Sequence, residues 1–351
     1  MEMRGLVMAG NTKKVIKKVI SWSGLFFFCL AAYMLYRQLS KYSLDDIKNA
    51  LFAIPARNLL LACVASICGY IALSSYDFLA LKYIKRKLAA WKWILVGFIG
   101  FSVSNNAGHA IVSGGTIRYR MYTRWRFKGS EIVRMVTFSG FTYLIACFFL
   151  IIVGYCITPD HAFGDGSVSK LTTQITALVA LAGLSGYFAL SVWYKKPLII
   201  KEIEFDMPLP KMALAQVFIG AADILMASMV LYFALTAFVD IPFQTFMGVF
   251  IIANVLGTFS QVPGGLGVFE GLFMYIIPGE HNRAMLFGAL LAYRIIYYLL
   301  PLVISAVMLV SYEWYLGKVN KQKIERIKLF RLQNIDAKGN LTTPKDKKKR
   351  R

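Results

Sequence analysis

The sequence predicts an all-α polytopic membrane protein, and three observations support this fold class. Hydrophobic residues make up 58% of the chain and the mean hydropathy is +0.57, whereas soluble domains contain about 45–50% apolar residues. Several apolar runs exceed the ~18 residues that indicate a membrane-spanning helix; the run from Asn58 to Ala80 carries a single charged residue, Asp77. The chain also lacks the short alternating strands of a membrane β-barrel.

Charge divides the chain into three parts. The formal net charge is +22, with basic residues concentrated at both ends. Residues 1–18 are predicted to be a basic cytoplasmic N-terminus and 19–317 the membrane domain, followed by a basic cytoplasmic tail, 318–351, that is largely disordered. Such a tail touches anionic lipid head groups, so nucleic acid is not an expected partner.

Apolar runs set the expected helices, and charged loops set their direction. The predicted helices lie at 19–36, 58–81, 93–112, 131–157, 170–194, 211–238, 243–258, 267–278 and 283–315. Segment 82–92 contains Lys and Arg but no acid and is placed in the cytoplasm. Segment 158–169 contains Asp160 and Asp165 but no Lys or Arg and is placed outside.

The segment 93–117 is predicted to enter the membrane from the cytoplasm and return to it. The stretch that follows, "RYRMYTRWRFKGSEIVR", is strongly basic and would otherwise lie outside. The sequence "SNNAGHAIVSGG" is too polar and too rich in glycine for a helix that faces lipid. Such backbone is tolerated at membrane depth only where protein or a water-filled cavity surrounds it.

The segment 243–278 is predicted to start and end outside, because the last helix must run inward to the basic tail. Two half-helices joined by the turn "QVPGGLGVFEG" satisfy this requirement, and each is too short to span a bilayer. The topology is then about six full transmembrane helices plus two oppositely oriented re-entrant hairpins. This arrangement suggests an inverted repeat. The alternative is about eight conventional spans, with one loop that breaks the positive-inside rule.

Ionisable residues inside spans are costly and mark paired or functional groups. The deep candidates are Asp77, His109, Asp223, Glu270 and Arg294, with Arg118 and Arg120 just past the first hairpin. Arg294 is expected to pair with Asp223 or Glu270, and these groups also suit a polar path for a charged head group.

The glycines of "SGG" and "PGGLG" allow positive φ angles and close backbone approach. The stretch "RYRMYTRWR" suits either an interfacial phosphate-binding strip or a plain interfacial anchor. The sequence has no HExxH, CxxC, Walker or nucleophile-elbow motif, so neither an enzyme nor a cofactor or metal is expected.

Three motifs occur in order: "SNNAGHAIVSGGTIRYRMYTRWRFKGSEI", "QVPGGLGVFEG" and "AYRIIYYLLPL". Together they resemble the integral-membrane region of the lysylphosphatidylglycerol synthase/flippase family, the multiple peptide resistance factors, over most of 15–315. The resemblance implies lipid translocation, and the short tail implies that the synthase domain is absent. The residues it implies are Gly114, Gly115, Arg118, Arg120, Pro263, Gly264, Gly265, Glu270, Tyr293 and Arg294.

The sequence therefore predicts a lipid translocase in the bacterial cytoplasmic (inner) membrane, with both termini cytoplasmic. Its substrate would be a membrane phospholipid or an aminoacylated phosphatidylglycerol. The alternative is a non-transporting subunit that binds lipid or docks a lipid-metabolism enzyme. A third class, a membrane-embedded lipid-modifying enzyme, is disfavoured by the missing motifs. A homo-oligomer and a lipid-synthesis partner are both compatible with the sequence.

Overall fold

The computed structural model describes residues 45, 48–49, 52–107, 110–157, 170–200, 203–260, 262–276 and 283–333. The predicted helix 19–36, the predicted outer loop 158–169 and His109 lie outside these residues. By contacts the chain divides into two units, Met1–Ser305 and Ala306–Arg351. The groups discussed below all belong to the first unit.

Five helices among the described residues are long and apolar enough to cross a membrane. They are α3 (Ala56–Tyr83), α6 (Gly129–Ile157), α7 (Lys170–Trp193), α8 (Pro210–Leu235) and the helical stretch Met285–Lys318. That last stretch joins α11 (Arg283–Tyr293), the π-helical segment η3 (Arg294–Leu299) and α12 (Leu300–Gln333). The prediction of a mainly helical chain with several helices of membrane-spanning length is confirmed. A short antiparallel pair, β1 (Leu198–Ile200) and β2 (Ile203–Phe205), connects α7 to α8.

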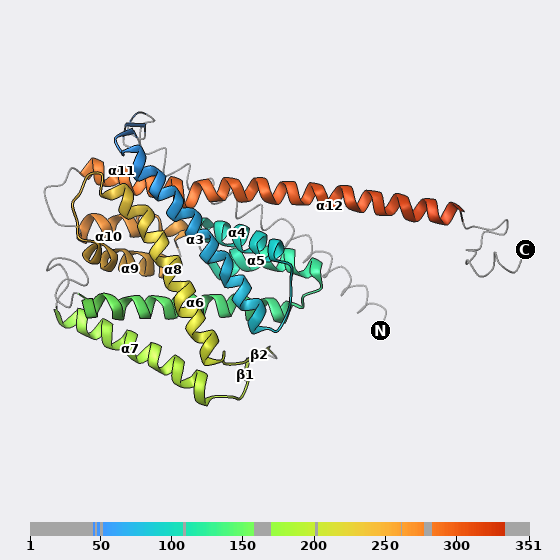
Figure 1. Cartoon of the computed structure of the whole chain (residues 1–351), viewed down its shortest axis with the longest axis horizontal. Helices are drawn as coiled ribbons and strands as arrows, with labels where there is room; N and C mark the ends of the chain where they lie inside the picture. The colour runs from blue at the N-terminus through green and yellow to red at the C-terminus, as the bar shows by residue number, and fades with distance from the viewer. Residues whose placement is uncertain are drawn as a thin grey trace, which may run out of the picture. The chain divides into compact units, whose positions relative to one another are not determined.

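The centre of the first unit is the antiparallel contact between α3 and α8, which lie side by side in Figure 1. Small residues allow their backbones to approach closely: a Cβ atom on Gly69 would lie 3.3 Å from the Cβ of Met226. Near the start of α3, the Asn58 amide donates a hydrogen bond of 2.8 Å to the carbonyl of Phe233. Pro210 opens α8, where a missing N–H costs nothing.

A first helical hairpin consists of α4 (Ala90–Ala107) and α5 (Ala110–Tyr122). A Cβ on Gly114 would overlap Ser104 Oγ, and a Cβ on Gly100 would lie 3.4 Å from the Arg118 guanidinium, so the two helices run antiparallel. The prediction of one helix over 93–112 was wrong. Residues 110–122 form a helix of their own, because the glycines of "SGG" permit tight packing against α4 instead of breaking the helix.

A second helical hairpin consists of α9 (Phe243–Phe259), the 3₁₀ turn η2 (Pro263–Gly265) and α10 (Val268–Ile276). Its antiparallel helices are held by aromatic contacts, with Phe246 and Phe273 ring centroids 5.7 Å apart. The turn requires glycine, since Gly264, Gly265 and Gly267 have φ angles of +62°, +62° and +83°. A further short turn, η1 (Thr123–Trp125), follows α5.

The π-helical segment η3 has a specific cause. In an α-helix the N–H of residue 301 would donate to the carbonyl of Tyr297, and in a π-helix to that of Ile296. Pro301 has no N–H and can donate to neither. Both carbonyls instead accept hydroxyl groups from α3: Tyr70 donates to Tyr297 at 3.1 Å, and Ser66 donates to Ile296 at 3.1 Å. The polar side chains of α3 thus allow an irregular helix inside the membrane domain.

Candidate functional site

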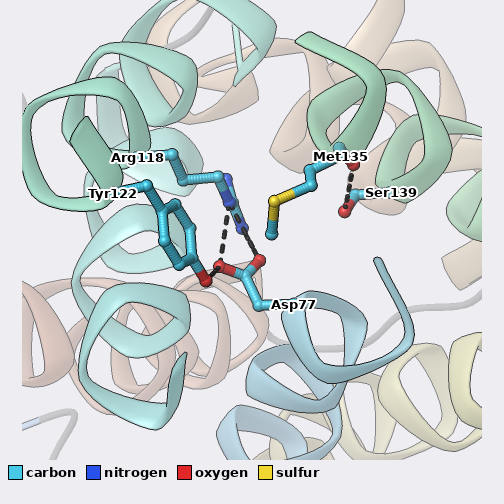
Figure 2. A network of polar contacts seen from close by, with 5 residues as sticks. All are labelled: Asp77, Arg118, Tyr122, Met135 and Ser139. Atoms are coloured by element: carbon cyan, nitrogen blue, oxygen red, sulfur yellow. Dashed lines mark hydrogen bonds and ion pairs between the residues drawn. The ribbon is translucent and has the colours of Figure 1, made fainter. Parts of the chain in front are cut away.

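The first polar cluster joins α3 to the first hairpin. The Arg118 guanidinium donates to the Asp77 carboxylate, with Nη2 2.7 Å and Nε 2.9 Å from Oδ1. The Tyr122 hydroxyl donates to the other oxygen at 2.8 Å. Figure 2 shows Arg118 and Tyr122 converging on Asp77, with the Met135 side chain of α6 pointing into the same contact. Asp77 and Arg118 are only 1% and 3% exposed, so this is a buried, hydrogen-bonded ion pair.

Local helix geometry explains how Arg118 reaches this position. Arg118 and Tyr122 are four residues apart on α5, so both side chains lie on one face. Gly100 and Gly114 leave the room that the guanidinium fills, since a Cβ on Gly114 would lie 3.1 Å from Arg118 Nη1. The guanidinium also lies 4.4 Å from the centroid of the Phe101 ring.

The second polar cluster joins the second hairpin to η3. Arg294 Nε donates to Glu270 Oε1 at 2.6 Å, and Arg294 Nη1 donates to the carbonyl of Gly264 in the glycine turn. Glu270 Oε2 accepts the N–H of Gly267 at 2.7 Å, which caps the start of α10. Arg294 is 3% and Glu270 6% exposed. One arginine thus holds both the turn and the first residues of α10.

The third cluster is centred on Asp223 of α8. Its carboxylate accepts hydrogen bonds from the Tyr76 hydroxyl at 2.9 Å and from the Tyr297 hydroxyl at 3.3 Å. Asp223 is 5% exposed. Among the described residues no Lys or Arg forms a salt bridge with it. A buried carboxylate bonded by phenols alone differs chemically from the two ion-paired carboxylates.

Aromatic rings connect the three clusters. Phe101, which lies beside Arg118, packs edge-on against Tyr76 with 5.4 Å between centroids. On the other side of Asp223, Tyr297 stacks on Tyr293 at 5.6 Å. Tyr293 in turn stacks at 5.6 Å on Phe269, which lies 5.5 Å from the Arg294 guanidinium. The three clusters are therefore joined by a continuous series of ring contacts.

The end of α4 lies close to the turn of the second hairpin. A Cβ on Gly264 would be 3.7 Å from the carbonyl oxygen of Asn105, near the end of α4. The side-chain amide of Asn106 donates at 3.1 Å to the carbonyl of Tyr298 in η3. The end of α4 thus meets both the turn η2 and the π-helical segment, which are far from it in sequence.

The structure distributes the predicted site residues over different clusters and turns. Arg294 pairs with Glu270, which was one of the two expected partners, and not with Asp223. The expectation that Arg118 lies just past the hairpin was wrong: α5 continues to Tyr122, so Arg118 is buried within the hairpin. Arg120 and Gly115 are half-buried. The remaining predicted residues lie as described above, with Gly114 beside Arg118, Pro263, Gly264 and Gly265 in the turn η2, and Tyr293 stacked beside η3.

Sequence reasoning missed the partners of the charged groups. Asp77 was recognised as deep but not as the partner of Arg118. The phenols of Tyr76, Tyr122 and Tyr297 were not identified, because a tyrosine in an apolar run carries no signal of its hydrogen bond. Within the described residues, no group of three His, Cys, Asp or Glu side chains is placed to hold a metal ion.

The chain resembles known proteins over most of its length. The family profile of the lysylphosphatidylglycerol synthase TM region matches residues 19–305. The Synechocystis sp. protein slr0712 is 28% identical over 86% of this chain and 94% of its own length. The Escherichia coli inner membrane protein YbhN is 27% identical over 84% of this chain and 91% of its own length.

Larger relatives match over only part of their length. A phosphatidylglycerol lysyltransferase of Staphylococcus aureus (strain MRSA252) is 26% identical over 90% of this chain but only 36% of its own length. The match to such proteins is thus confined to about a third of them.

Proposed function

The chain belongs to the family of the lysylphosphatidylglycerol synthase transmembrane region, and from this membership and the buried charges we propose that it is a lipid translocase. It moves a phospholipid or an aminoacylated phosphatidylglycerol between the leaflets of the bacterial cytoplasmic membrane. It acts as a transporter and not as an enzyme.

The proposed topology has about six full spans and two oppositely oriented re-entrant hairpins, with both termini in the cytoplasm. The two ends of the first hairpin are neighbours, since the Trp91 and Trp125 ring centroids are 6.3 Å apart, which supports entry and exit on one side. In the second hairpin, α10 has nine residues, about 13 Å of helix, and is too short to span.

An inverted repeat is part of the proposal. The first copy is α3, the hairpin α4–α5, and α6; the second is α8, the hairpin α9–α10, and the last helical stretch. The antiparallel packing of α3 and α8 is the arrangement expected of inverted copies. In each copy a buried ion pair ties the hairpin to a spanning helix: Asp77–Arg118 in the first and Glu270–Arg294 in the second.

The observation that carries the proposal is the end of α4, which meets the turn η2 beside the three buried ionisable clusters. Breaking a buried ion pair is costly unless another charge replaces the lost partner. A lipid head group supplies such charges: its phosphate replaces the carboxylate at Arg294 or Arg118, and an ammonium group meets the freed Glu270 or Asp77. Asp223 lies between the two ion pairs. The half-buried Arg120 recruits the lipid phosphate at the cytoplasmic face, while the acyl chains stay in the lipid bilayer.

Lipid movement in proteoliposomes tests the proposal, with labelled phosphatidylglycerol and its lysyl form as probes. Wild-type protein is expected to move one lipid at least tenfold faster than protein-free vesicles. Glu270→Gln and Arg294→Gln are expected to lose this movement. The matched controls Glu204→Gln and Lys211→Gln change exposed charges and should retain it.

Each variant must first be shown to be folded by its melting temperature in detergent. Failure of the folded wild type to move either lipid would contradict translocation of these lipids. That result would favour the alternative, a subunit that binds lipid or docks an enzyme of lipid metabolism.

A further inference from the structure

The three buried carboxylates among the described residues are not equivalent. Asp77 and Glu270 each face a guanidinium, whereas Asp223 accepts hydrogen bonds only from phenols. Adding a proton to Asp77 or Glu270 would leave Arg118 or Arg294 buried without a counter-charge, which is strongly unfavourable. Adding a proton to Asp223 leaves no described arginine or lysine without its counter-charge.

We propose that Asp223 is a proton-binding site, and that its protonation couples lipid movement to the proton gradient. The coupling rests on the proposed translocase function, whereas the proton site stands on its own. In the binding step, a proton from water forms an O–H bond on one carboxylate oxygen of Asp223. The same proton returns to water when the carboxylate is regenerated, so no other reactant is needed.

Among the described residues, the groups around Asp223 are titratable but not charged. Tyr70 and Tyr76 come from α3, Tyr143 and Cys147 from α6, and Tyr297 from η3, and all five lie close enough to Asp223 to respond to its charge. Phenols and thiols are neutral at physiological pH in their ordinary state. From α9, the Asn254 amide oxygen accepts the Tyr143 hydroxyl at 3.1 Å, and from α11, Tyr293 stacks on Tyr297. Within the described part of the chain, the charge at this place is therefore set by Asp223.

A second set of buried polar groups lies on α8 before Asp223. The Tyr187 hydroxyl of α7 donates to Gln216 at 2.7 Å, and Gln216 donates to Thr142 Oγ1 at 2.8 Å. Gln216 lies two helical turns before Asp223, on the same face of α8. Between them Gly220 allows close packing of α8 against α6, since a Cβ there would lie 2.5 Å from the Ala146 Cβ and 2.8 Å from the Thr142 carbonyl. The polar groups on this face of α8 therefore extend from Gln216 to Asp223.

The second hydrogen bond of Asp223 connects protonation to the hairpin. Tyr297 lies three residues after Arg294, which holds Glu270 and the glycine turn. When Asp223 is charged, it accepts from both phenols. When it carries a proton, it is itself a donor and competes with one of them. The π-helical segment, whose carbonyls rely on side-chain donors from α3, is the element that this exchange displaces.

Infrared spectroscopy of the purified protein tests the proton site without any lipid movement. The exposed acids also titrate, so the spectrum of Asp223→Asn is subtracted from that of the wild type. The difference is expected to contain a carboxylic C=O band that titrates with pH, and the same band is expected when Asp240→Asn, an exposed acid after the end of α8, replaces the wild type. Asp223→Glu is expected to restore such a band. A difference spectrum without a titrating band would overturn the proton site.

Proteoliposomes with a clamped pH difference and no membrane potential test the coupling. A difference of one pH unit is tenfold in proton activity, so one proton per lipid shifts the leaflet ratio about tenfold at equilibrium. The shift is expected in the wild type and Asp240→Asn, whereas Asp223→Asn distributes the lipid equally. A shift retained in Asp223→Asn, or one driven by a sodium gradient instead, would overturn the coupling. Wild type that moves no lipid, yet keeps the titrating band, would overturn the translocase and leave the proton site standing.

Discussion

At the scale of single residues, the ion pair of Asp77 and Arg118 is expected to matter for stability before any question of transport. Asp77→Asn keeps the shape of the side chain but leaves a buried guanidinium without a counter-charge. We expect a loss of about 3–5 kcal/mol in the free energy of unfolding. Chemical unfolding in detergent measures it.

Two further variants sharpen this test. Asp77→Asn combined with Arg118→Gln removes both charges and is expected to recover most of the loss, since no ion stays buried and unpaired. Asp206→Asn removes the partner of Arg134 where the carboxylate is 57% exposed, and should cost at most about 1 kcal/mol. Equal effects of Asp77→Asn and Asp206→Asn would contradict the buried pair.

Two adjacent glycines give a second prediction, with opposite signs. Gly114→Ala places a methyl group against Ser104 and 3.1 Å from Arg118 Nη1, with the Gly100 carbonyl at 3.2 Å. Overpacking of this kind costs about 1–3 kcal/mol. Gly115→Ala meets only Val136 at 3.9 Å and should gain up to about 1 kcal/mol from helix propensity.

Melting temperatures in detergent distinguish Gly114→Ala from Gly115→Ala. Combining Gly114→Ala with Ser104→Ala should recover part of the stability lost in Gly114→Ala. If Gly115→Ala were the more damaging variant, the antiparallel register of α4 and α5 would be wrong.

The pairing of Glu270 with Arg294 could be anticipated, because both were isolated charges in apolar sequence and a glutamate three residues after Gly267 suits a helix start. The partner of Arg118 could not be anticipated in this way. Its position depends on α5 continuing through "SGGTIRYRMY", and glycines usually indicate a break. The hydrogen bonds to Asp223 come from tyrosines on two other elements, which a linear pattern cannot bring together.

At the scale of elements, the π-helical segment is expected to depend on α3. Removing the two hydroxyls with Ser66→Ala and Tyr70→Phe leaves the carbonyls of Ile296 and Tyr297 without their donors. We expect a cost of about 0.6–3 kcal/mol in unfolding free energy. In a Pro301→Ala background the cost should be smaller, because the restored N–H can serve one of the two carbonyls.

The four proteins of this cycle are compared by unfolding in detergent. If the loss in unfolding free energy were equal in both backgrounds, Pro301 would not be the reason why these two carbonyls lack a backbone N–H donor. Proline inside a helix is a common cause of irregular geometry. The sequence could not indicate which hydroxyls compensate, since Ser66 and Tyr70 lie more than 220 residues before their acceptors.

At the scale of the whole molecule, hydropathy predicted the five apolar spans of the described residues because length and composition suffice for such helices. The hairpins needed a second kind of information, the sign of charge in the loops. Basic residues lie at both ends of α4–α5, and Asp240 precedes α9. The contact between α3 and α8, by contrast, depends on small residues spread along both helices and is not visible from either alone.

The topology gives a final prediction, tested with single cysteines in a background without native cysteine. Lys87 and Arg124 are exposed residues before α4 and after α5. Since the ends of this hairpin are neighbours, Lys87→Cys and Arg124→Cys are expected to react with an impermeant thiol reagent only from the cytoplasmic side. Lys196→Cys should behave alike, and Asp240→Cys should react only from outside. If α4–α5 crossed the membrane as one conventional span, Arg124→Cys would react from the side opposite to Lys87→Cys. The inverted repeat would then have to be abandoned.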